Sequence, residues 1–112
     1  MSRFAPVPSS PNCVSSRAPV DDRQHYIAPL QGVTLEQVKA AALAMPRTTV
    51  LEQSESYVHL VCATAILRFK DDVELEAEGD VVHVRSASRV GYGDLGVNRK
   101  RIEALRKALT EQ

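Results

Sequence analysis

The chain has 112 residues, 44% of them hydrophobic and only five aromatic, and its 14 basic residues balance its 14 acidic ones. This length suits a single domain with an aliphatic core, and the balanced charge argues against nucleic-acid binding, which normally needs a basic surplus. No apolar run is long enough to span a membrane and no signal peptide is visible, so we expect a cytoplasmic protein.

The N-terminal third of the chain lacks a periodic pattern. Residues 1–12 contain Pro6, Pro8 and Pro11 beside two serines, which predicts an extended or flexible arm. Residues 13–32 have no clear period and indicate either a long ordered loop wrapped on the domain or a partly disordered lead. We therefore expect an arm over 1–12 and a single domain over 13–112.

A first helix is predicted after Thr34, whose side chain caps it and forms a capping box with Gln37. Val33 and Val38 make a hydrophobic staple at its start, and Pro46 ends it. The apolar stripe of this helix comprises Leu35, Val38, Ala42 and Met45.

After this helix the apolar residues recur with a period of two, which is typical of strands. Four strands are predicted, over Thr48–Gln53, Tyr57–Ala63, Val73–Ala77 and Val81–Ser88. A further apolar stretch, Ile66–Phe69, either continues the second of these strands through a bend or forms a short separate piece.

A two-residue turn at Gly79 and Asp80 joins the last two strands and fixes their register. That register pairs apolar residues on one face and opposite charges on the other, so a slip of one residue would destroy both patterns. The expected pairs are Leu75 with Val84, Ala77 with Val82, Glu74 with Arg85, and Glu76 with His83.

A last helix is predicted from Asn98, a good cap residue, with Val97 and Ile102 as its staple and Ile102, Leu105 and Leu109 as its stripe. Strands clustered between two helices indicate an α+β fold. We expect an antiparallel sheet of about four strands with two helices packed on one face, in the order α-β-β-β-β-α.

The loop Arg89–Val97 is the best candidate site, because three glycines lead into a helix start, where free amides favour an anion. Basic residues 99–101 occupy the unfavourable end of the helix dipole, which a bound anion or partner carboxylate would explain. The candidate ligand-binding residues are Arg85, Ser86, Ser88, Arg89, Tyr92, Asp94, Asn98, Arg99 and Arg101. Alternatively, the arginines pair with Asp71, Asp72, Glu74 and Asp94 and only fasten the loop.

A second cluster of polar residues, Pro11–Ser16, precedes the first helix. Its residues either support the loop site or form side-chain turns. We expect Cys13, Asp72 and Arg89 to converge at one rim of the sheet. Cys13 with His25 is also a candidate pair of nucleophile and base. The supporting residues are Asn12, Cys13, Ser15, Ser16, Asp71 and Asp72.

We expect no metal and no cofactor. Cys13 and Cys62 lack partners at zinc-ligand spacing, and Cys62 is predicted to be a core residue. The acidic run over 71–78 fits a solvated sheet face better than a cation site. His59 and His83 beside Glu76 are a weaker metal candidate.

Three segments, Pro11–Ser16, Phe69–Glu74 and Arg85–Arg106, resemble the domain-of-unknown-function family 1499. The resemblance spans nearly the whole chain and implies that the three segments form one unit. It implies no established activity, cofactor or substrate. Members of this family are often preceded by a membrane or export segment.

The leading functional hypothesis is a non-enzymatic module that binds a small anion or an acidic partner group at the Arg85–Arg101 loop. One alternative is a thiol-dependent enzyme that uses Cys13 and His25. The other is a protein–protein interaction domain that docks through its exposed sheet face. The oligomeric state is not predicted.

Overall fold

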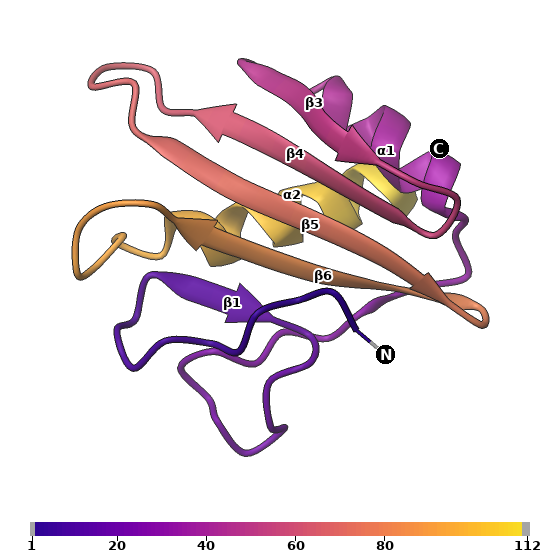
Figure 1. The fold of residues 1–112 in the computed structure, drawn as a ribbon, viewed down its shortest axis with the longest axis horizontal. Helices are drawn as coiled ribbons and strands as arrows, with labels where there is room; N and C mark the ends of the chain where they lie inside the picture. The colour runs from indigo at the N-terminus through magenta and orange to yellow at the C-terminus, as the bar shows by residue number, and fades with distance from the viewer. Residues whose placement is uncertain (1, 111–112) are drawn as a thin grey trace.

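The computed structural model describes residues 2–110, which form one antiparallel sheet and two helices (Figure 1). The predicted α+β fold is confirmed. The strands are β1 (Cys13–Ser15), β2 (Leu30–Gln31), β3 (Thr48–Gln53), β4 (Tyr57–Ala63), β5 (Lys70–Glu78) and β6 (Val81–Ser88). The helices are α1 (Leu35–Leu43) and α2 (Val97–Thr110).

The four long strands match the predicted ones, although β5 extends beyond Val73–Ala77 at both ends. The sheet order is β1-β6-β5-β4-β3, with β2 also paired to β6. The predicted register of the β5–β6 hairpin is confirmed at all four expected pairs, from Glu74 opposite Arg85 to Ala77 opposite Val82. Gly79 has a φ of 60° in the turn, a conformation that glycine adopts without steric cost.

Two short strands enlarge the sheet beyond the predicted four. β1 and β2 come from the non-periodic segment 13–32 and pair antiparallel with the same edge of β6. Val14 and Leu30, one from each strand, join the hydrophobic core. The segment is thus an ordered loop that adds edge pairing, as one of the two sequence alternatives proposed.

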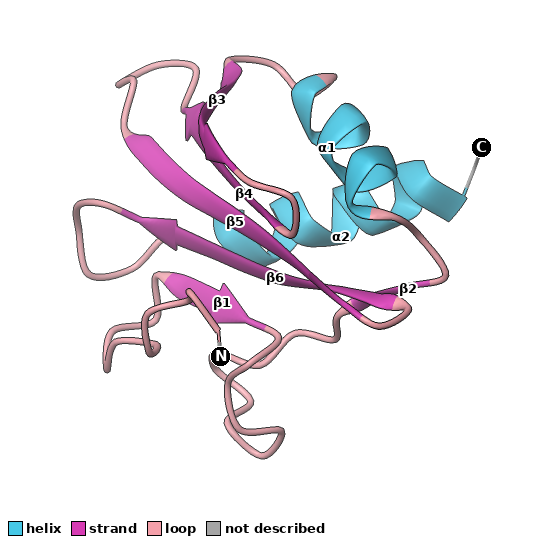
Figure 2. Cartoon of the chain, turned by 45° about the vertical axis from the view of Figure 1, so that its right-hand side comes forward, coloured by secondary structure: helices cyan, strands magenta, loops and turns pink. Residues whose placement is uncertain are grey.

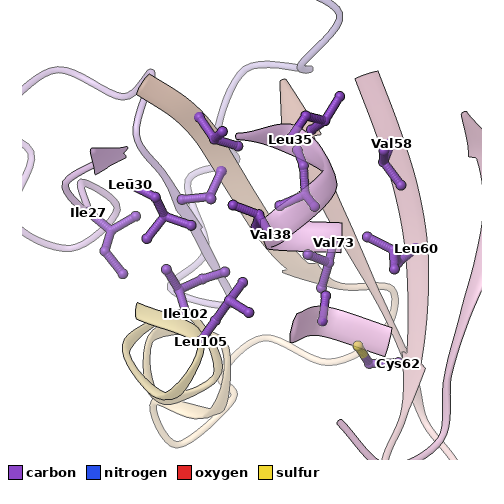
Figure 3. Packing of buried hydrophobic residues seen from close by; sticks show 14 of the residues in the cluster. Ile27, Leu30, Leu35, Val38, Val58, Leu60, Cys62, Val73, Ile102 and Leu105 are labelled. Atoms are coloured by element: carbon purple, nitrogen blue, oxygen red, sulfur yellow. The ribbon is translucent and has the colours of Figure 1, made fainter. Parts of the chain in front are cut away.

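Both helices cover one face of the sheet (Figures 1 and 2). The capping box of Thr34 and Gln37 is present at α1. Val38 on α1 and Ile102 on α2 point into a core of mostly aliphatic side chains, to which β4, β5 and β6 also contribute (Figure 3). The shared apolar face fixes both helices on the sheet.

The start of α2 differs from the prediction. The helix begins at Val97, so Asn98 lies inside it, and its side chain is buried. Val97 is 37% exposed, whereas Ile102, its expected staple partner, is fully buried. The cap is supplied from further upstream, by Asp94, whose carboxylate accepts the N–H groups of Gly96 and Asn98.

Residues 2–12 form no helix or strand, and they pass in front of β1 towards β6, on the side of the sheet opposite to the helices (Figure 1). Ile66–Phe69 belongs to the loop between β4 and β5 and does not extend a strand. Within residues 2–110, neither helix has the length and hydropathy required to span a membrane.

Candidate functional site

A buried polar network occupies the rim of the sheet where β6 ends and α2 begins. Asn98 is fully buried at its centre. Its amide nitrogen donates to Asp94 Oδ2 at 2.7 Å and to Ser88 Oγ at 2.9 Å, and its Oδ1 accepts from Ser86 Oγ at 2.7 Å and from Arg101 Nη1 at 2.9 Å. One amide therefore satisfies several polar groups that burial would otherwise leave unpaired.

The same network contains a buried ion pair. Arg101 Nη2 lies 2.7 Å from Asp71 Oδ2, and the two side chains are only 12% and 3% exposed. Asp71 is on the helix-covered face of β5, since the next residues on that face are Val73 and Leu75. The pair joins the sheet to the first turn of α2.

Asp94 occupies the anion position at the helix start. Its Oδ1 accepts the Gly96 N–H at 2.8 Å, and its Oδ2 accepts the Asn98 N–H at 3.2 Å. Burial alone would raise the pKa of Asp94, but the hydrogen bonds from Asn98 and Gly96 outweigh it and lower the pKa. The ionised carboxylate thus supplies internally the negative charge that the helix dipole favours.

The predicted arginines all have partners. Arg101 contacts Asp71 as described, and Arg89 makes a two-pronged contact with Asp72, at 2.9 and 2.8 Å. Arg85 Nη1 lies 3.5 Å from Glu74 Oε2. Arg99 donates to the carbonyls of Arg23 and Gln24, both at 3.3 Å. The contacts of Arg85 and Arg89 are those of the alternative in which arginine–carboxylate pairs fasten the loop, whereas Arg99 bonds to backbone carbonyls instead of a carboxylate.

The arm meets the glycine loop through Asn12. Its carbonyl accepts the Ser88 N–H at 3.0 Å, and its side chain donates to the Gly91 carbonyl at 2.7 Å. Ser15 and Ser16 do not take part, because they bond within their own segment and to His83 and Val84. Asn12 is therefore the link between the arm and the rim.

Cys13 lies in the same row of the sheet as Asp72, because both pair with Ala87 from opposite sides. Arg89 reaches the same row through Asp72. Cys13 is fully buried, however, so these three residues share a face of the sheet without forming an open cleft.

The thiol-enzyme alternative gains no support from this geometry. Burial raises the pKa of Cys13, whereas a nucleophilic thiol needs a lowered one. The ring nitrogens of His25 are engaged by the Asp22 carboxylate and the Ser10 carbonyl, each at 2.8 Å. Neither group is poised for chemistry on the other.

We expect both thiols to react only after unfolding, because Cys13 and Cys62 are buried. With a chromogenic disulfide reagent at pH 8, the native protein should react slowly, at a rate set by opening of the fold. The rate in guanidinium chloride should be that of a free thiol. A fast native thiol with an apparent pKa well below 8.5 would contradict this arrangement.

A groove opens at the same rim, between the β4–β5 loop and the β6–α2 loop. We call it the rim groove. Its volume is about 530 Å³, and it is lined by Thr64, Phe69, Asp71, Ser88, Val90, Gly91, Gly93, Asp94, Leu95 and Val97. Both loops extend from the same end of the sheet (Figures 1 and 2). Three predicted site residues, Asp71, Ser88 and Asp94, therefore form polar parts of its lining.

The two loops hold most of the large exposed apolar side chains found among residues 2–110, including Ile66 at 89% and Leu95 at 94% exposure. The sequence pattern does not predict this surface, since it indicates that Ile66–Phe69 either continues the second strand through a bend or forms a short separate piece. The others in the two loops are Leu67, Phe69, Val90 and Tyr92, with Val97 at the start of α2.

No group of three or more His, Cys, Asp or Glu side chains gathers as a metal site anywhere in residues 2–110. His59 instead contacts Asp72 at 2.7 Å, and His83 contacts Ser16 at 2.8 Å. The two histidines therefore do not converge on Glu76.

In a comparison with protein families, residues 3–109 match the family described as a protein of unknown function (DUF1499). The match covers nearly the whole chain and confirms the resemblance seen in three sequence segments. No curated protein matches the chain.

Proposed function

The chain belongs to the family of proteins of unknown function DUF1499, and we propose that it is a binding module that docks a protein partner in the rim groove. The observation that carries this proposal is the clustering of exposed apolar side chains on two loops that enclose one groove. Contiguous apolar surface of this kind marks interaction sites in soluble proteins.

The lining of the groove defines the chemistry of its occupant. Phe69, Val90 and Leu95 supply apolar surface, whereas Asp71, Ser88 and Asp94 supply oxygen atoms. The Asp71 carboxylate is paired with the buried guanidinium of Arg101, and the Asp94 carboxylate accepts hydrogen bonds from Asn98 and Gly96. The groove therefore suits a bulky apolar side chain that lies next to an ammonium or N–H donor, as a peptide segment provides.

The loops are held in place before any partner arrives. Thr64 donates its N–H to the Phe69 carbonyl and accepts the Phe69 N–H at its hydroxyl, both at 2.9 Å. Asn12 and Asp94 fix the other loop. An ordered groove loses little conformational entropy when it binds, which favours affinity.

The backbone conformation and exposure of Leu95 also support docking of a partner in the rim groove. Its φ is 56°, in the left-handed region that disfavours a residue with a Cβ by about 1 kcal/mol. Its side chain is nevertheless almost fully exposed, so no packing within the chain offsets that cost. A bound partner that covers Leu95 would supply the missing contact.

Anion binding by the arginines is the weaker proposal. An anion at Arg89 would have to compete with the Asp72 carboxylate, and one at the helix start would have to compete with Asp94. Docking on a lipid bilayer is also less well supported, because hydrocarbon offers no donors to the oxygen atoms of the groove. Anion binding predicts saturable binding of phosphate in a titration, whereas docking on a bilayer predicts saturable binding of phosphatidylcholine vesicles.

The test is Leu95→Asn, because asparagine tolerates the left-handed conformation. We expect this change to raise the free energy of unfolding by about 0.5–1 kcal/mol. It should weaken binding of the probe N-acetyl-Phe-Lys-amide about tenfold, since a leucine contact is lost. Affinity is measured by titration calorimetry, and stability by urea unfolding.

Leu51→Ser is the matched control, because Leu51 is an exposed apolar residue of β3 outside the groove. It should leave probe affinity unchanged. Equal affinity of the Leu95→Asn variant and the unaltered protein would sink the proposal. Saturable binding of phosphate, or of phosphatidylcholine vesicles, without binding of the probe would also reject it and favour the corresponding rival.

A further inference from the structure

The sheet face opposite the helices carries polar side chains that are unusually well buried. Tyr57, Glu74 and Glu76 lie on this face, and each is at most 9% exposed. The strand alternation places them away from the core, so their cover must come from another part of the chain. The N-terminal arm provides part of it, through Ser2 and Arg3 on Glu76 and Arg3 on Tyr57, and Arg17 and Arg85 provide more.

The arm holds an arginine against this face. The guanidinium of Arg3 lies 3.9 Å from the centroid of the Tyr57 ring, and its Nη2 contacts the Glu52 carboxylate. The Arg3 N–H donates to Glu76 Oε2 at 2.9 Å, and the Ser2 hydroxyl donates to Glu76 Oε1 at 2.8 Å. A cation is thus bound by an aromatic face and a carboxylate, while its backbone is bound by a second carboxylate.

The receiving residues do not depend on the arm for their positions. Glu76 pairs with Tyr57 and His83 in adjacent strands, and Arg17 also contacts its carboxylate. The Tyr57 hydroxyl is fixed by a hydrogen bond to Glu74, which orients the ring. The sheet therefore presents a formed receptor for a guanidinium, independent of which segment fills it.

The arm itself is held loosely. Its residues 2–9 form no strand, and only Phe4 and Val7 among them are partly buried. Beyond the contacts of Ser2 and Arg3, the Pro6 carbonyl accepts a hydrogen bond from Arg85 at 3.2 Å, the Ser9 carbonyl accepts one from Gln24 at 3.3 Å, and the Arg17 guanidinium lies 5.8 Å from the centroid of the Phe4 ring. The contacts of Arg3 with Glu52, of Pro6 with Arg85 and of Ser9 with Gln24 are exposed, and exposed polar contacts contribute little stability each.

We infer that this face is a docking site for an extended peptide segment with an arginine, and that the chain's own Ser2-Arg3-Phe4 segment occupies it in cis. We call it the arginine site. It lies on the face opposite to α1 and α2 and is built from β3, β4 and β5, so it is independent of the rim groove. A second segment with the same chemistry would bind by displacing the arm.

The test uses a fluorescent peptide with the sequence of residues 2–8 and the full chain carrying Ser2→Ala with Arg3→Ala. The unaltered chain presents its own arm at a high effective concentration, so it should bind the peptide weakly. The double variant frees the arginine site and should bind the peptide at least tenfold more tightly. Binding is measured by fluorescence anisotropy.

Two controls make the result specific to the guanidinium. The same peptide with alanine in place of arginine should not bind the double variant. Adding Glu52→Gln should weaken peptide binding several-fold without loss of fold, because Glu52 is exposed. Peptide binding that is equal in the unaltered chain and the double variant, absent in both, or unchanged without the arginine would overturn the inference.

Discussion

Arg101→Met is expected to lower the free energy of unfolding by about 3–5 kcal/mol, the typical cost of breaking a buried ion pair. The substitution keeps most of the volume of the side chain but leaves the Asp71 carboxylate buried without its cation. Arg101 also donates to Ser86 and Asn98, so two further acceptors lose a partner. Urea unfolding followed by circular dichroism measures the loss.

Removing both charges should be much less harmful than removing one. In Asp71→Leu with Arg101→Met, apolar groups replace the pair, and such replacements are often close to neutral. We expect the double variant to recover most of the loss, which gives a coupling free energy of about 2 kcal/mol or more. Additive losses in the two single variants would show that the pair is not coupled as the structure indicates.

Asn98→Leu is expected to cost about 3 kcal/mol. Leucine has a similar size but leaves the hydroxyls of Ser86 and Ser88 and the Asp94 carboxylate without the amide that joins them. Each buried polar group that loses its partner costs about 1–3 kcal/mol. If Asn98 were only a helix cap, the cost would be about 1 kcal/mol.

Lys100→Leu is the control for that measurement, since Lys100 is an exposed residue of the same helix turn. It should change stability by no more than about 0.5 kcal/mol. A loss for Asn98→Leu that is no larger than for Lys100→Leu would contradict the central place of Asn98 in the network.

The sheet was predictable because its signals are local and repeated. Alternating apolar residues and the Gly79-Asp80 turn determine the β5–β6 register from sequence alone, and the register is confirmed. β1 and β2 have three and two residues, which is too short for any period to show. Their pairing depends on the edge of β6, a partner distant in sequence.

The candidate site was predictable only as a concentration of polar groups. Asn98 has the sequence features of a helix cap. Its hydrogen bonds to Ser86 and Ser88, which place it at the centre of a buried network, depend on the packing of α2 against β6. The sequence identifies the arginines as candidates, but the carboxylate that each one contacts depends on how the strands and the helix are arranged in the fold. Exposure of Leu95 has no sequence signal, because the same residue type usually enters a core.

The most direct test of the central claim is an NMR titration of the uniformly labelled protein with N-acetyl-Phe-Lys-amide. The account predicts saturable shift changes confined to residues 64–71 and 88–97, and intermolecular contacts between the probe ring and the side chains of Phe69 and Leu95. Shift changes that do not saturate, or that cluster away from both loops, would contradict the assignment of the rim groove as the binding site.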